Sequence, residues 1–236
     1  MNEEPLSLPP IYRPVRVAAG EDAMDHAAGL AAAGCDPATL VWAAREDRLD
    51  CAIVLAPSEP LAEAARVLFC GVLGIGDALA VLLPPRVDVD FIWPGEVRIN
   101  ARRGAWARLL APPGTGAGDV PDWLVLGAVV RVTGEPSPGS GDGLDDAPQT
   151  TLHFEDCSEI GVSDLLEAFS RHVLTRLNRW LDDGFEPIRR SWTLRAYGDD
   201  APAAGGTFEA LTERGDLRIN IDDGPRELAL LDALRM

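Results

Sequence analysis

The positively charged side chains of this 236-residue chain are all arginines, which restricts the chemistry that it can perform. Its 21 basic residues include no lysine, so Schiff-base lysines, lysine general bases and the phosphate-binding lysine of P-loop enzymes are excluded. An arginine guanidinium binds carboxylates and phosphates through a planar set of N–H donors. Any anionic substrate group is therefore expected to meet arginine.

Two places in the sequence hold the arginines of interest. Arg102 and Arg103 follow a predicted hairpin turn, and Arg131 lies near the end of the most apolar predicted strand. An arginine that faces inward from a central strand must be paired or must meet an anionic ligand, because an unpaired buried charge is costly. Glu96 or Asp90 is the expected partner of Arg131. The alternative for Arg103 is a solvated charge on a hairpin.

Charge and composition exclude several classes of function. The chain has 38 acidic residues and a net charge of −17, which argues against nucleic acid and against an anionic membrane surface. Its three histidines show no metal-ligand spacing and its four cysteines form no Cys-x-x-Cys pair, so we expect no metal site. The acidic start lacks a secretory signal, and no uncharged apolar run has transmembrane length. We expect a cytoplasmic protein, from a GC-rich bacterial genome.

The elements that must position these residues read as short strands and two long helices. Residues 61–83 are almost entirely apolar and predict a buried helix, whereas 162–183 predict an amphipathic one. Tight turns between neighbouring strands favour an α+β fold with a mixed, partly antiparallel sheet and packed helices. The other predicted elements are helices 22–33 and 188–197 and strands 15–18, 39–42, 50–55, 87–93, 97–99, 104–110, 123–133, 207–211, 217–221 and 226–230.

Three parts follow from this pattern. Residues 1–14 hold four prolines and read as an extended N-terminal arm. Residues 15–197 form the α+β domain. Residues 205–236 form a small β-barrel-like C-terminal module, because about thirty residues cannot hold a large core of their own and must lean on the main domain.

Three motifs, in this order, resemble the biotin/lipoate protein ligase superfamily. The first is Trp-Pro-Gly-Glu at 93–96, followed by an apolar strand, an Asn turn and the pair Arg102-Arg103. The second is the glycine-bearing strand 125–130, and the third is the helix pair within 165–196. The C-terminal module resembles the SH3-like domain of the same enzymes. This resemblance implies a ligase-like fold for most of residues 15–234.

The resemblance also implies a reaction and its residues. Family members activate biotin, lipoate or a related carboxylate with ATP and pass the acyl group to a lysine of an acceptor protein. The implied partners are a small carboxylate ligand or a biotinyl or lipoyl acceptor domain. A homodimer is one possible assembly, and the sequence leaves the oligomeric state open. Arg103 falls at the family's catalytic lysine. The implied substrate-binding residues are Trp93, Gly95, Glu96, Arg102, Trp106, Gly127 and Arg131.

The sequence departs from the family where the adenylate would lie. The family's glycine- and arginine-rich loop falls on residues 43–49, which contain no glycine and two acids; glycine lets backbone N–H groups approach a phosphate. Arg103 replaces lysine with a bulkier, planar cation. Trp106 replaces a glycine, which predicts a plug in the ligand groove, or alternatively a stacking platform.

Two hypotheses remain open. We favour a non-catalytic binding or scaffold relative with a degenerate adenylate site. The missing glycines, the missing lysine and the filled groove are independent losses that all point to lost adenylate chemistry. The alternative is a divergent active ligase in which Arg102, Arg103 and Arg131 neutralise carboxylate or phosphate. Trp93 also fits a core position, and Gly127 a close helix contact.

Overall fold

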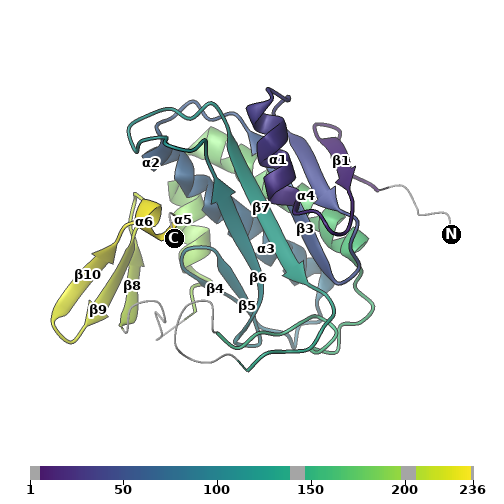
Figure 1. Cartoon of the computed structure of the whole chain (residues 1–236). Helices are drawn as coiled ribbons and strands as arrows, with labels where there is room; N and C mark the ends of the chain where they lie inside the picture. The colour runs from purple at the N-terminus through teal and green to yellow at the C-terminus, as the bar shows by residue number, and fades with distance from the viewer. Residues whose placement is uncertain (1–5, 139–146, 198–205, 235–236) are drawn as a thin grey trace.

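A seven-stranded mixed sheet forms the centre of the computed structural model, which describes residues 6–138, 147–197 and 206–234 (Figure 1). The strand order is β1-β2-β3-β7-β6-β5-β4. β1 runs parallel to β2, and the other neighbouring pairs are antiparallel. The predicted α+β fold with a mixed sheet is therefore confirmed. The strands are β1 (Arg13–Val17), β2 (Thr39–Ala43), β3 (Arg48–Leu55), β4 (Val89–Ile92), β5 (Glu96–Ile99), β6 (Arg102–Leu110) and β7 (Leu124–Arg131).

One face of the sheet is covered by two layers of helix. The predicted apolar helix is present as α2 (Leu61–Ala64), a 3-10 turn (Ala65–Val67) and α3 (Leu68–Leu82), and α4 (Val162–Asp183) packs on α3. A Cβ at Gly74 of α3 would lie 2.8 Å from Val173 Cβ of α4, so glycine permits this close contact. Residues 61–82 are long and apolar enough to span a membrane, but 72% of that window is buried inside the fold. The helix α3 is packed between the sheet and α4, which accounts for its apolar composition.

The other face of the sheet carries the short helix α1 (Ala23–Ala32) over β2, β3 and β7 (Figure 1). Asp22 caps this helix, because its side chain accepts hydrogen bonds from the N–H groups of Met24 and Asp25 at 2.8 and 3.1 Å. Apolar side chains of α1 and the strands beneath it form a small second core, which includes Met24, Ala27, Val41, Ala52, Val54 and Val125. This face is called the α1 face below.

The predicted C-terminal β module is a three-stranded antiparallel sheet followed by a short helix; its elements are β8 (Thr207–Leu211), β9 (Leu217–Ile221), β10 (Gly224–Leu228) and α6 (Leu230–Leu234). Its likeness to an SH3 domain stays a prediction. The module docks beside α5 (Glu186–Thr193), where the ring centroids of Phe208 and Trp192 are 6.0 Å apart. Three domain side chains also donate hydrogen bonds to module carbonyls: Arg66 to Glu213, Trp93 to Gly215 and Arg189 to Leu211.

The described part of the predicted arm packs along α4. The Tyr12 hydroxyl donates to the Ser170 carbonyl at 3.1 Å, and the Ser7 N–H donates to Glu167 at 2.7 Å. Burial raises the pKa of Tyr12. Residues 1–5 of the arm, and residues 198–205 before the module, lie outside the described residues.

Candidate functional site

The α1 face beside helix α1 holds the charged residues of β5, β6 and β7. In β5 and β7, alternate residues such as Val97, Leu126 and Val130 belong to the core beneath α3 and α4. Because successive strand side chains point to opposite faces, Glu96 and Arg131 lie on the α1 face. The alternation of side chains along the strands thus puts two of the predicted site residues on the same face of the sheet.

A β-bulge brings Arg103 to the same face. Val97 pairs with Ala105, but the next residue, Arg98, pairs with Arg103, so Gly104 is an extra residue in β6. A Cβ at Gly104 would lie 2.6 Å from Ile99 Cδ1, which explains why the bulge needs glycine. Beyond the bulge the alternation of β6 is reset, and Arg103 shares the face of its partner.

Arg103 lies among other candidate residues on this face. Its guanidinium is 4.0 Å from the Glu96 carboxylate and 5.8 Å from the centroid of the Trp106 ring. Glu96 also accepts a hydrogen bond from Arg98 at 2.9 Å. At the predicted catalytic position, the Arg103 guanidinium therefore lies over an aromatic ring. It shares the Glu96 carboxylate with Arg98.

Three arginines come together at the end of β7. Arg131 pairs in register with Arg48 of β3. Burial, followed by the charges of Arg103 and Arg48, lowers the pKa of Arg131. We call Arg48, Arg103 and Arg131 the arginine cluster. Such mutual repulsion favours a bound anion, because an anion would offset it.

The partner of Arg131 differs from the one predicted. Its guanidinium donates to the Gln149 side chain at 2.7 Å and to the Glu135 carbonyl at 3.2 Å, and neither Glu96 nor Asp90 is its partner. Gln149 reaches it because the segment that follows β7 returns to β6, where it forms a single parallel bridge with Arg103. The prediction failed because a long-range neighbour supplied a neutral acceptor.

A buried carboxyl adjoins the arginine cluster. The Asp50 side chain is 1% exposed and accepts a hydrogen bond from Arg48 at 3.4 Å. Burial, followed by the negative charge of Asp22, raises the pKa of Asp50. Asp50 Oδ1 and the buried Nε atoms of Arg48 and Arg108 have no hydrogen-bond partner among the described residues. Buried polar atoms are normally satisfied by protein or by ordered water, so water or a polar ligand group would complete the hydrogen bonding of these three.

The turn between β2 and β3 lies next to this carboxyl. Several polar groups of the turn already have hydrogen-bond partners within the protein. The N–H groups of Ala44 and Arg45 donate to the carbonyls of Val17 and Ala43 at 2.9 and 2.8 Å. The Arg45 side chain donates twice to Asp47, both times at 2.9 Å. The hydrogen bond from Arg45 is the main cause that lowers the pKa of Asp47. Two amides of this turn and the Arg45 side chain are therefore engaged by groups of the protein itself.

Gly127 lies under α1. A Cβ at Gly127 would lie 2.9 Å from the sulfur of Met24, and Met24 is 3% exposed. The side chain that covers this glycine is thus Met24. The predicted plug, Trp106, is half-buried and lies in register with Val129, two residues along β7. The structural interpretation of Gly127, a close helix contact, fits this geometry.

Three other predicted residues lie elsewhere. Trp93 is buried in the core on the helix-covered side and donates to the Gly215 carbonyl at 2.9 Å. Gly95 lies against β6, where a Cβ would lie 2.5 Å from the Ala107 carbonyl oxygen. Arg102 lies over the Phe154 ring, 5.7 Å from its centroid. We do not retain these three as ligand-binding candidates.

Comparison of the sequence and the fold with known proteins identifies the family of this chain. A sequence model of the Biotin/lipoate A/B protein ligase family matches residues 8–194. The chain belongs to this family. It is 30% identical over 164 residues to the biotin–[acetyl-CoA-carboxylase] ligase of Paracoccus denitrificans, a match that covers 67% of this chain and 65% of that one. The chain thus matches less than two thirds of that ligase.

Two solved structures of family-like proteins show the same fold. A biotin protein ligase-like protein of unknown function from Silicibacter sp. is 31% identical, with a TM-score of 0.85 and coverage of 98% of this chain and 99% of that chain. The biotin protein ligase of Aquifex aeolicus in complex with biotin and ATP has a TM-score of 0.68 and 14% identity, with 92% and 95% coverage. The second likeness concerns the fold alone.

Sequence reasoning missed part of the family member's polar site. Arg48 was assigned to the turn before β3, and Asp50 and Arg108 were not singled out, because a charged residue in a predicted strand is expected to face solvent. The alternation of β3 carried the signal, since Ala52 and Val54 belong to the core under α1 and Asp50 shares their face. Within the described residues, no group of three or more His, Cys, Asp or Glu side chains is arranged to hold a metal ion.

Proposed function

We propose that this family member is a non-catalytic relative that binds a small carboxylate at the arginine cluster and does not make an acyl-adenylate. The observation that carries the proposal is the closed β2–β3 turn. The N–H groups of Ala44 and Arg45 donate to protein carbonyls, and the Arg45 side chain is paired with Asp47. Glu46 and Asp47 add two negative charges to the turn. A nucleotide phosphate needs free backbone N–H groups and positive charge. This turn has no glycine, and its arginine is already paired with a carboxylate.

The arginine cluster supports the carboxylate part of the proposal. The hydrogen bonds of Arg131 within the described residues go to neutral acceptors, and the Asp47 charge offsets its repulsion from Arg103 and Arg48 only in part. A ligand carboxylate placed there would meet cations from three strands. The Trp106 ring beside Arg103 would supply apolar contact for the rest of the ligand. Guanidinium–carboxylate pairs of this kind are among the strong hydrogen bonds in proteins.

The alternative, a divergent active ligase with an acceptor protein as partner, is favoured by the same arginines. Arg103 keeps a positive charge where the family has its lysine, and it lies on the face that also holds Glu96. Loss of one donor that stabilises developing charge commonly costs about 10²–10³ in rate. Replacement of the lysine together with loss of the glycine loop argues against adenylation. A cytoplasmic location and a homodimer belong to both versions.

Calorimetry and an exchange assay separate the two. We expect Mg-ATP to bind more weakly than about 1 mM, or less than roughly 4 kcal/mol. We expect no ATP–pyrophosphate exchange with biotin or lipoate. Either acid should bind without ATP, and Arg131→Gln should weaken that binding about tenfold or more. Arg226→Gln, on the exposed strand β10, is the matched control and should bind normally.

Two outcomes would overturn the proposal. Exchange that depends on biotin or lipoate, together with micromolar ATP binding, would establish the active ligase. Absence of binding by both acids, in the parent and in Arg131→Gln alike, would remove the carboxylate site. The function would then have to lie on another surface of the fold.

A further inference from the structure

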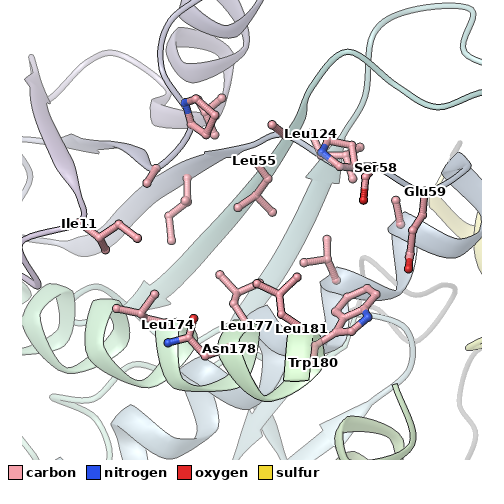
Figure 2. Close-up of a pocket in the computed structure, with 18 of the residues that line it drawn as sticks. Ile11, Leu55, Ser58, Glu59, Leu124, Leu174, Leu177, Asn178, Trp180 and Leu181 are labelled. Atoms are coloured by element: carbon pink, nitrogen blue, oxygen red, sulfur yellow. The ribbon is translucent and has the colours of Figure 1, made fainter. Parts of the chain in front are cut away.

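An apolar groove lies on the opposite, helix-covered face of the sheet, between the end of β3 and the C-terminal half of α4 (Figure 2). Its volume is about 360 Å³. Its walls are formed by Ile53, Leu55, Leu124, Leu174, Leu177 and Trp180. The groove shares no lining residue with the arginine cluster, so it is independent of the proposed function.

The groove is elongated and its two ends differ. Figure 2 shows Ile11 and Leu174 at one end, and Ser58, Glu59 and Trp180 at the other. Within the described residues, Glu59 is the charged side chain of the lining. The first end is uncharged, with the Asn178 amide beside Leu174, and the other end is negative (Figure 2).

The charge of Glu59 is only partly compensated. The Arg66 guanidinium lies 3.9 Å from the Glu59 carboxylate but 2.8 Å from that of Glu63. Arg66 also donates to the Glu213 carbonyl. The net charge of the chain, −17, adds to the negative potential at this end. A second carboxylate would be repelled there.

The groove is preformed and its rim is apolar. Its walls are the long strand β3, whose residues 49–54 are buried, and α4, a helix of 22 residues. Leu181 and Ile11 line the groove and are 82% and 56% exposed. Rigid walls prevent collapse, and exposed apolar residues gathered at one cleft mark a binding site.

We infer that this groove binds an aliphatic chain whose head group is cationic or uncharged, with the chain toward Ile11 and the head toward Glu59. At about 30 Å³ per water-sized group, the volume has room for roughly a dozen such groups, which matches a chain of about ten carbons and its head. The apolar walls recognise the chain, and Glu59 selects against carboxylate heads.

Three probes of equal chain length test the inference: decylamine, 1-decanol and decanoate, each below its micelle concentration. Binding is followed by saturation-transfer NMR and calorimetry on the whole chain. We expect decylamine and decanol to bind, and decanoate to bind at least tenfold more weakly than decylamine. Glu59→Gln should reduce the preference for decylamine over decanoate severalfold. Glu209→Gln is the matched control, because Glu209 is exposed on β8 and does not line the groove.

Two further variants test the position of the chain. Leu55→Trp should fill the middle of the groove and lower the affinity for decanol at least tenfold, whereas Leu194→Trp, at an exposed site outside the groove, should not. Leu181→Gln removes only an exposed side chain at the rim, so it keeps the test valid should Leu55→Trp fail to fold. It should weaken decanol binding severalfold.

Several results would overturn the inference. Decanoate binding as tight as decylamine would refute the head-group selection. Binding unchanged in both Leu55→Trp and Leu181→Gln would place the probes elsewhere. No binding by any probe, with a dimer in sedimentation that Leu181→Gln converts to monomer, would assign the groove to a second copy of the chain.

Discussion

The contact between Gly127 and Met24 yields the sharpest prediction. A methyl group at position 127 would lie 2.9 Å from the Met24 sulfur and 3.6 Å from its Cε and Cγ. Met24 is enclosed by the core under α1, so it has little room to move away. Overpacking of this kind costs about 1–3 kcal/mol. For a chain of this size, Gly127→Ala should therefore lower the melting temperature by about 2–12 °C.

Removal of Met24 should reverse the sign of that effect. Met24→Ala alone should cost about 2–5 kcal/mol, because it leaves a cavity. In that background the new methyl group has space, and Gly→Ala gains about 0.4–1 kcal/mol by restricting the unfolded chain. Gly127→Ala should then be neutral or stabilising. The coupling energy between the two sites should fall within the range of about 0.5–3 kcal/mol found for contacting residues.

The assay is urea unfolding of the four chains of this cycle, followed by circular dichroism. Gly29→Ala is the control, because Gly29 is exposed on the same helix and a Cβ there meets nothing within 4 Å. It should stabilise the protein by about 0.8–1 kcal/mol. A Gly127→Ala chain as stable as the parent, or additive effects in the cycle, would show that Met24 does not fill this space.

Three further predictions concern the module, the buried carboxyl and the bulge. Trp93→Phe leaves the Gly215 carbonyl without its indole donor and should cost about 1–3 kcal/mol in thermal unfolding; an unchanged melting temperature would contradict it. Because burial raises the pKa of Asp50 in the folded chain, its contribution is complete below the unfolded pKa of about 3.9 and is lost as pH rises through the folded pKa. The stability of Asp50→Asn relative to the parent should therefore rise from about pH 4 upward, and a difference independent of pH in urea unfolding would refute this. Gly104→Ala should cost about 1–3 kcal/mol by overpacking against Ile99 and should weaken carboxylate binding in calorimetry by displacing Arg103; normal binding would show that the bulge does not position it.

The sequence predicted the elements well because their signals are local. Apolar periodicity predicted α3 and α4, and the turn residues predicted the hairpin of β5 and β6. The β10 strand was placed two residues late, and the helix α6 after it was missed. A stretch of five residues carries too little periodicity to separate strand from helix.

The candidate site was predicted only in part. Its residues are brought together by strand pairing and by long-range contacts, which a sequence pattern does not reveal. Arg103, Glu96, Trp106 and Arg131 lie on one face of the sheet, and their role in binding stays a prediction. The face of Arg103 depends on a bulge, and the acceptor of Arg131 comes from a segment distant in sequence. Trp93 read as a ligand contact because its motif is shared with the ligases, but its indole contacts the C-terminal module.

The docking of that module has a consequence for how the family member unfolds and how it can be divided. Leu211, Leu217 and Ile219 of the module belong to the same continuous core as α3 and α5. Truncation near residue 205 would expose the edge of the Trp192 ring to water and leave the Trp93 indole N–H without its acceptor. The boundary visible in the sequence therefore crosses a continuous hydrophobic core. Domain exchange between relatives would succeed only if the aromatic contact and the three carbonyl acceptors were transferred together.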